Sequence, residues 1–164
     1  MTIKGRVFKY GDNVNTDVIF PGKYTYTVTD VKEQAQHSLE DLDPNFMKEM
    51  KPGDIVVAGT NFGCGSSREQ AASCLKYAGL GAIVAKSFSR LYYRNAINFG
   101  LPAVVIPAEA VDAIQRGDEV EVDLEAGKVR TAGREYNFPP LPEYVAGIFK
   151  AGGLDEFIKA KMTK

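Results

Sequence analysis

Residues 59–70 read GTNFGCGSSREQ and decide the fold that we expect for this chain. The apolar run Ile55–Ala58 before them predicts a short buried strand. The glycines predict a turn, and a helix is expected over about residues 67–78. Gly63 and Gly65 permit positive φ angles and a close approach of the backbone to a ligand. The sequence therefore predicts a strand, a tight turn and a helix at this point.

Charged and hydroxyl side chains gather at the start of that predicted helix. Helix starts attract anions because their backbone N–H groups are free and the helix dipole is positive there. Arg68 in the predicted first turn is unfavourable for the dipole, and it is easier to explain if it faces an anion, since arginine grips a carboxylate with two hydrogen bonds. Ser66 and Ser67 lie beside it. The pattern indicates a site for a small carboxylate or phosphate, with a hydroxyl available for chemistry.

The loop alone leaves a purely structural interpretation open. A serine-capped turn with solvated charges would have the same residues, because glycine turns before helices are common. The phosphate-binding pattern GxxxxGK[ST] is absent, since Gly59 and Gly65 have the wrong spacing and no Gly-Lys follows them.

Composition restricts the classes of protein and of partner. The chain has 164 residues, enough for one domain with a real core. Its net charge of −1 argues against nucleic acid and against an anionic membrane surface as partners. No apolar run approaches the roughly 20 residues of a membrane-spanning helix. Residues 1–10 lack the apolar core of a signal peptide. We therefore expect a cytoplasmic protein.

The rare residue types argue against a metal centre within this chain. Two cysteines cannot hold an iron–sulfur cluster or a four-cysteine zinc site. Cys74 falls in the predicted helix and is expected in the core, whereas Cys64 in the loop is a candidate reactive thiol. His37, the only histidine, is predicted to be a surface residue, which argues against Ser-His-Asp and Cys-His chemistry.

The hydrophobic pattern predicts an α/β fold, with a mixed sheet flanked by helices in one domain over residues 1–164. Strands are expected over residues 3–10, 55–58, 82–86, 101–106, 119–124, 128–131 and 136–138. Helices are expected over residues 31–38, from 43–44 onward, and over 67–78, 88–99, 107–115, 141–150 and 154–162, with Ser87 as a cap.

Three segments together resemble one known family. They read NTD at residues 15–17, GCGSSRE at 63–69, and SFSR at 87–90 followed by RNAINFGL at 94–101. Their order and spacing resemble the swivelling domain of the aconitase superfamily. The length is similar to that of its stand-alone form, the small subunits of isopropylmalate isomerases (3-isopropylmalate dehydratases) of the short archaeal-like type. The resemblance covers nearly the whole chain.

The resemblance implies a hydro-lyase that isomerises 2-isopropylmalate to 3-isopropylmalate in leucine biosynthesis. It implies a large-subunit partner that carries a [4Fe–4S] cluster, without which this chain is inactive. A small hydroxy-diacid is the expected substrate. This chain would close over the cluster and supply the base. The cluster is thus expected in the partner, with no cofactor in this chain.

The resemblance also assigns roles to particular residues. Ser66 matches the family's catalytic serine, which takes a proton from the carbon next to a carboxylate and returns it to the neighbouring carbon. Arg68 matches the arginine that binds the substrate carboxylate, and Ser67 matches a supporting hydroxyl. Asp17 matches an aspartate with a role in acid/base support; from the residues alone it could equally be a cap.

The loop at residues 24–27 is expected to read the variable branch of the substrate, with Tyr24 and Tyr26 as binding residues. Tyr26 stands where homoaconitase-like members place an arginine that pairs with a third carboxylate. Tyrosine cannot make that ion pair, so an apolar branch such as isopropyl or methyl is expected. Because such a loop waits for its partner, we also expect residues 24–28 to be mobile in the isolated chain.

Some positions leave alternatives open. Gln70 stands where the family usually has a histidine, so hydrogen bonds around the site are expected to differ. Arg90 and Arg94 lie one helical turn apart and are structural, subunit-contacting or catalytic. The alternative functions are a small subunit of 2,3-dimethylmalate dehydratase, a homoaconitase-type subunit and, from another class, a phosphate- or anion-binding module.

Overall fold

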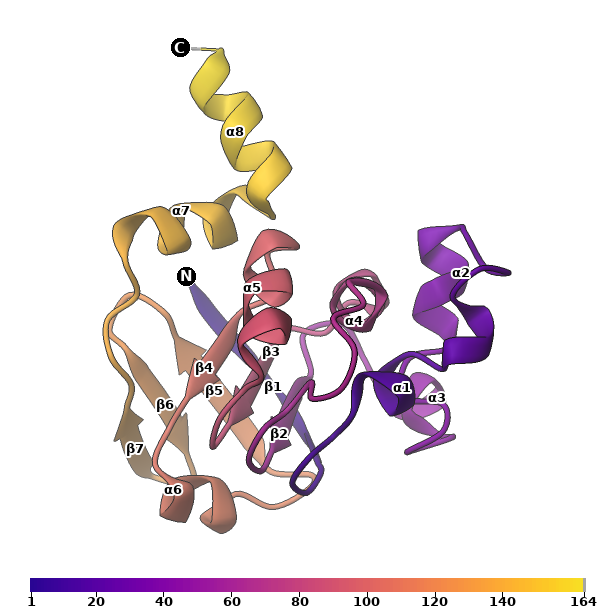
Figure 1. Ribbon diagram of the computed structural model, residues 1–164. Helices are drawn as coiled ribbons and strands as arrows, with labels where there is room; N and C mark the ends of the chain where they lie inside the picture. The colour runs from indigo at the N-terminus through magenta and orange to yellow at the C-terminus, as the bar shows by residue number, and fades with distance from the viewer. Residues whose placement is uncertain (164) are drawn as a thin grey trace.

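A mixed sheet in the order β4-β3-β2-β1-β5-β6-β7 forms the centre of the computed structural model, which describes residues 1–163 (Figure 1). Four strands run parallel to one another: β1 (Thr2–Lys9), β2 (Ile55–Ala58), β3 (Ala82–Ala85) and β4 (Ala103–Val105). The other three continue from β1 in antiparallel fashion: β5 (Glu119–Asp123), β6 (Lys128–Thr131) and β7 (Arg134–Asn137).

The parallel strands β2 and β3 are buried on both faces, as expected for short, continuously apolar runs. In β2, Val56 and Ala58 pack into the core on one face, while Ile55 and Val57 pack into a second core on the other. Neighbouring strands are in register, with Val57 opposite Val84 of β3. The antiparallel strands contribute to the second core only, so their outward side chains face solvent and carry charge.

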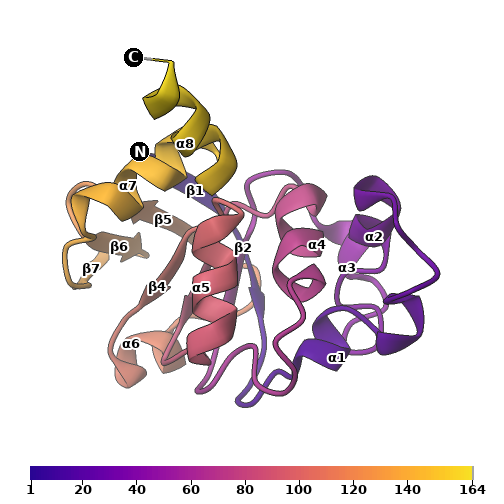
Figure 2. The same ribbon diagram turned by 45° about the horizontal axis from the view of Figure 1, so that its top comes forward.

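Helices cover both faces, and most of those near the parallel strands belong to the first core (Figure 2). They are α1 (Thr16–Ile19), the short 3₁₀ helix η1 (Gly22–Tyr24), α2 (Val31–Gln36), α3 (Phe46–Glu49), α4 (Gln70–Ala78) and α5 (Arg90–Asn98). The second core receives residues from α6 (Ala108–Ala113) and α7 (Glu143–Ala151), and α7 is followed by α8 (Leu154–Met162). Among residues 1–163, no helix combines the length and apolar character needed to cross a bilayer.

The predicted fold class, a mixed sheet flanked by helices, is confirmed. The strand predicted over residues 55–58 has these bounds, and Asp30 caps α2 by accepting from the backbone N–H groups of Lys32 and Glu33. The last residue of the predicted domain, 164, lies outside the described part of the chain.

Four predicted helix starts were two or three residues too early, and one of them is that of α7, which was expected from residue 141 and begins at Glu143. The helix expected from residue 67 begins at Gln70, and the one expected from 43–44 begins at Phe46. The helix expected from residue 88 begins at Arg90, because Ser87 is not its cap. The hydroxyl of Ser87 instead accepts a hydrogen bond of 2.7 Å from the backbone of Asn61, and so joins two loops.

Candidate active site

The loops that follow β1 and β2 run side by side past the ends of these strands. The backbone N–H of Asn13 donates to the carbonyl of Thr60, and that of Gly63 donates to Val14, each at 2.8 Å. Thr16 N–H donates to Cys64 at 2.8 Å, within an isolated parallel bridge between Asn15 and Cys64. Parallel pairing therefore continues beyond the sheet, and it brings the NTD and GSSRE segments together at the carboxyl ends of the strands, where α/β sheets commonly bind ligands.

The hydroxyl of Ser66 lies at the meeting point of these loops. Its Oγ is 3.1 Å from Nε of Arg68, which donates to it, and 3.3 Å from the hydroxyl of Thr16. Ser66 itself is exposed, so a ligand can reach it. A cationic donor directed at this oxygen stabilises negative charge that develops on it.

Arg68 connects the three segments that form the site. Besides Ser66, it donates through Nη1 to the hydroxyl of Thr25 at 2.8 Å and through Nη2 to a carboxylate oxygen of Asp17. Its side chain is 18% exposed, against 67% for Asp17. Three of the five N–H donors of the guanidinium are used in these contacts, which leaves two for a carboxylate ligand.

Asp17 is held in place through its own backbone. It lies in the first turn of α1, and its N–H donates to the side chain of Asn15 at 2.8 Å. Asn15 therefore is the cap of α1, while the carboxylate of Asp17 stays free to meet Arg68. The sequence left open whether this segment supplies a helix cap or a functional carboxylate. Asn15 is the cap, and Asp17 supplies the carboxylate that pairs with Arg68.

Two glycines allow the loop after β2 to pass close to Asn15 and Tyr92. Gly65 has φ of +96°, and a Cβ on it would lie 2.7 Å from the side-chain oxygen of Asn15. Gly63 has φ of +81°, and a Cβ there would overlap the ring of Tyr92. Both positions therefore require glycine, for backbone conformation and for space.

The predicted placement of Arg68 in the first helical turn was wrong. The N-cap of α4 is Glu69, whose carbonyl accepts from Ser73, and Arg68 before it accepts only a three-residue turn bond of 3.3 Å from Ala71, so Ser66, Ser67 and Arg68 belong to the loop before α4. Arg68 is held by side-chain contacts across the loops.

Sequence reasoning missed three residues that contact this group. Thr16 bonds Ser66, Thr25 bonds Arg68, and the side-chain amide of Asn95 on α5 donates to the carbonyl of Ser67 at 3.4 Å. All three lie within segments that the sequence singled out, but a hydroxyl or amide in a polar stretch gives no signal of which partner it meets.

Tyr24 and Tyr26 do not contact Ser66 or Arg68. The hydroxyl of Tyr24 donates to Glu40 at 2.9 Å, and its ring stacks on His37. Tyr26 is 92% exposed and projects from the loop. Direct contact of either tyrosine with a substrate stays a prediction.

The sole histidine is not the surface residue that the sequence predicted. His37 ends α2, stacks on Tyr24 with ring centroids 3.7 Å apart, and has Nδ1 2.6 Å from a carboxylate oxygen of Glu40. Its side chain is mostly covered because α2 packs beside the loop after η1. The sequence placed it in a polar stretch and gave no signal of this neighbour.

The two thiols differ in environment. Cys74 is fully buried in the first core, as predicted, and burial raises its pKa to about 12. Cys64 is partly exposed in the site loop, and both cysteines are free. Within residues 1–163, no three His, Cys, Asp or Glu side chains gather in a group that could hold a metal ion.

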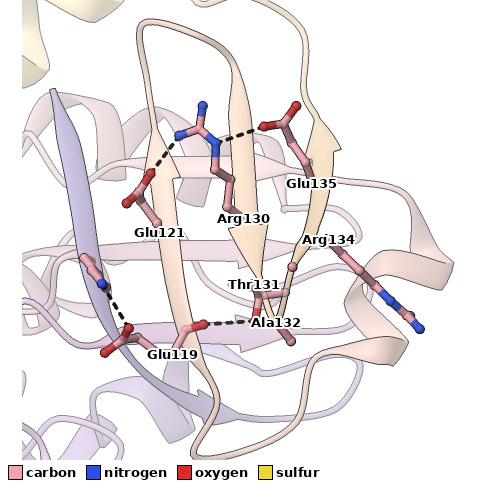
Figure 3. A pocket seen from close by; sticks show the side chains of 9 residues that line it. Glu119, Glu121, Arg130, Thr131, Ala132, Arg134 and Glu135 are labelled. Carbon is pink, nitrogen blue, oxygen red and sulfur yellow. Dashed lines mark hydrogen bonds and ion pairs between the residues drawn. The ribbon is translucent and has the colours of Figure 1, made fainter.

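Two hollows lie apart from the Ser66 group. One, of about 370 Å³, lies over β5, β6 and β7, where Arg130 forms ion pairs with Glu121 and Glu135 (Figure 3). Its charges are largely neutralised by each other. The other is a mainly apolar groove between α5, α7 and α8, with Arg90 and Arg94 at its edge. No residue of the Ser66 group lines either hollow.

Comparisons with known proteins agree with this geometry. The model of the aconitase C-terminal domain family matches residues 9–109. The 3-isopropylmalate dehydratase small subunit of Caldicellulosiruptor bescii is 52% identical, over 100% of this chain and 99% of that protein. The corresponding subunit of Aquifex aeolicus is 52% identical over 99% and 98%. A crystal structure of 3-isopropylmalate dehydratase from Methanocaldococcus jannaschii has a TM-score of 0.92 and 44% identity, and the match covers 99% of this chain and 96% of that one.

Proposed function

Because this chain belongs to the aconitase C-terminal domain family, we propose that it works as the small subunit of a hydro-lyase that isomerises 2-isopropylmalate to 3-isopropylmalate. The family predicted from the sequence is confirmed by the matches, and so is the prediction of a 3-isopropylmalate dehydratase small subunit in leucine biosynthesis. A cytoplasmic setting and a single domain over residues 1–164 are part of the proposal.

Ser66 is the base in this proposal. Its Oγ, as an alkoxide, takes the proton from the substrate carbon next to a carboxylate, and the hydroxyl on the neighbouring carbon leaves with the C–O bond pair to give an alkene. Ser66 then returns this proton to the carbon that lost the hydroxyl, and hydroxide adds to the carbon that lost the proton, so that the alkene is rehydrated in the opposite sense. A serine hydroxyl is a weak acid, so the alkoxide needs a fixed positive donor, and Nε of Arg68 at 3.1 Å supports this role.

Arg68 binds a substrate carboxylate with its remaining donors. A bidentate arginine–carboxylate pair fixes the plane and distance of the acid, and so holds the acidic carbon near Ser66. Ser67 adds a hydroxyl on the exposed side of the loop. Asp17 orients Arg68 through their ion pair and supports proton transfer at the same edge.

The iron–sulfur cluster belongs to the partner in this proposal. The thiols of this chain do not fit cluster ligation, since Cys74 is buried with a raised pKa and Cys64 is a single ligand. A large subunit is implied because the relatives are named small subunits. When bound there, the cluster supplies a Lewis acid for the leaving hydroxyl.

The loop after η1 supports an apolar branch on the substrate. Thr25 contacts Arg68, and the side chain of the next residue, Tyr26, is exposed and so accessible to a ligand. An isopropyl group suits a tyrosine ring better than a third carboxylate does. Tyr24 is a second substrate-binding residue of this loop in the proposal. A methyl-branched acid such as 2,3-dimethylmalate requires the same kind of surface and is compared directly in the assay.

The contact between Ser66 and Arg68 carries this proposal, and a reconstitution assay tests it. The chain is mixed with its large subunit under anaerobic conditions with iron and sulfide, and alkene absorbance is followed with isopropylmalate, dimethylmalate and homocitrate. We expect turnover of isopropylmalate, only with both chains present. Preference for dimethylmalate would change the assigned substrate but not the proposed chemistry. Turnover of homocitrate would contradict the role of Tyr26. No activity with any of the three acids would contradict the proposed function.

A further inference from the structure

The ring of Tyr24 is held on two sides by residues that follow or end α2. Its centroid lies 3.7 Å from that of His37, with an interplanar angle of 22°. Its hydroxyl donates to Oε1 of Glu40 at 2.9 Å. It also packs at a tilted angle on Phe20, with centroids 6.3 Å apart. Through these contacts, Tyr24 holds the loop that begins at η1 in place.

Both oxygens of Glu40 are engaged in this arrangement. Oε1 accepts from Tyr24 and lies 3.7 Å from Nζ of Lys23, and Oε2 is 2.6 Å from Nδ1 of His37. Partial burial alone would raise the pKa of Glu40, but the hydrogen bonds from His37 and Tyr24 hold that pKa below its ordinary value. Glu40 is thus a charged acceptor, which makes its hydrogen bonds stronger than those between neutral groups.

Thr25, the residue after Tyr24, contacts Arg68 of the candidate active site. Thr25 Oγ1 accepts from Nη1 of Arg68 at 2.8 Å, and Arg68 in turn donates to Ser66. The backbone between them turns tightly, since Thr25 N–H donates to Gly22 and Val28 N–H donates to Tyr24. A shift of Tyr24 would therefore move Thr25 against the guanidinium and change the direction in which Tyr26 projects.

We propose that Glu40 and His37 are positioning residues for substrate binding, which hold the loop at residues 22–28 against Arg68 through Tyr24. They act at a distance from the reacting atoms, because neither contacts Ser66, Arg68 or Asp17 in the described structure. Their effect on turnover rests on the proposed function, whereas their effect on the loop does not.

A solely structural role for Glu40, His37 and Tyr24 predicts a different effect of mutation from the one that a positioning role predicts. If they only stabilised the fold, Glu40→Gln would raise exchange throughout the chain and leave KM unchanged. A positioning role predicts a local effect on the loop and a change in KM, with kcat preserved, since the chemistry at Ser66 is untouched.

The first test uses hydrogen exchange in the isolated full chain. Glu40→Gln and Tyr24→Phe each remove the charged hydrogen bond, and we expect roughly tenfold faster exchange over residues 22–28, from the usual strength of such bonds. Exchange over β2 and β3 should not change. Glu33→Gln, an exposed carboxylate on α2, is the matched control. Unchanged loop exchange in both variants, or equal acceleration everywhere, would overturn the proposal.

The second test uses the reconstituted complex. We expect Glu40→Gln to raise KM for isopropylmalate roughly tenfold with kcat within about twofold, on the same hydrogen-bond strength. Glu40→Gln and Tyr24→Phe together should cost less than the sum of the two single effects, because both act on the hydrogen bond between Tyr24 and Glu40. An additive loss, or a fall confined to kcat, would overturn the proposal. If the wild-type complex is inactive, the proposed function fails while the exchange experiment still decides the role of Glu40.

Discussion

Nε of Arg68 lies 3.1 Å from Oγ of Ser66, two residues earlier in the same loop. The direction of this hydrogen bond matters, because the guanidinium can only donate and the hydroxyl oxygen must accept. The serine proton is therefore free to point elsewhere, and positive charge faces the oxygen. This is the arrangement that an alkoxide base needs, and Asp17 and Thr25 keep the guanidinium in place.

Replacing Arg68 by lysine should reduce kcat/KM of the reconstituted complex by roughly 100-fold, given about 3 kcal/mol for lost charged hydrogen bonds. Lysine keeps the charge but cannot bond Ser66, Thr25 and Asp17 from one planar group. Steady-state kinetics measure the effect. Arg134→Lys, at the exposed start of β7, is the control and should retain activity. Near-normal kinetics for the Arg68 variant would show that charge alone suffices.

Gly65→Ala should lower both stability and activity. The backbone at Gly65 has φ of +96°, and the new Cβ would press on Asn15, so we expect a loss of about 1–3 kcal/mol in the free energy of unfolding. Gly133→Ala provides the comparison, because φ is +76° there but no atom lies within 4 Å of the new Cβ. It should cost about 1 kcal/mol and leave turnover unchanged. Denaturant unfolding and kcat measure both, and equal activity in the two variants would contradict the close approach at Asn15.

The sequence predicted the bounds of some short strands well where turn residues lie on both sides. The strands β2 and β6 have their predicted bounds, since each is a short run between glycine-rich or polar turns. Arg68 and Ser66 were predicted to be site residues because glycines, hydroxyls and a cation occur together. Asp17 could be either a cap or a functional carboxylate from the residues alone, and the family resemblance added its role in acid/base support.

Other parts of the site depend on contacts that the sequence does not encode locally. Arg68 meets Asp17 51 residues away only because β1 and β2 lie side by side and their loops continue the pairing. His37 meets Tyr24 because α2 folds back over η1. The start of α4 was misplaced because helix propensity does not reveal that residues 66–68 are held by other loops.

Thiol labelling should distinguish the two cysteines. In the native isolated chain, a neutral-pH thiol reagent should modify one thiol, Cys64, because Cys74 is fully buried and its pKa is raised to about 12. In denaturant both should react. Mass spectrometry of the labelled peptides identifies the site. Rapid native labelling of Cys74 would mean that α4 opens far more readily than its packing indicates.

Acid should destabilise the chain partly through Glu40. The folded-state pKa of Glu40 lies below its ordinary value of 4.5, so its contribution to stability is complete above that value and is lost as the pH falls through the lowered pKa. The difference in melting temperature between wild type and Glu40→Gln should therefore be constant near pH 7 and shrink below about pH 4.5. A difference that grows on acidification would contradict the sign of this pKa shift.

The most direct test of the central claim is kcat of the reconstituted complex with Ser66→Ala, set beside Ser67→Ala. Because Ser66 alone of the two accepts from Arg68, we predict a loss of roughly 10³-fold for Ser66→Ala, with complex formation intact, in the range typical for removing a general base. Ser67→Ala should lose far less. Full dehydratase activity in an assembled Ser66→Ala complex would contradict the account.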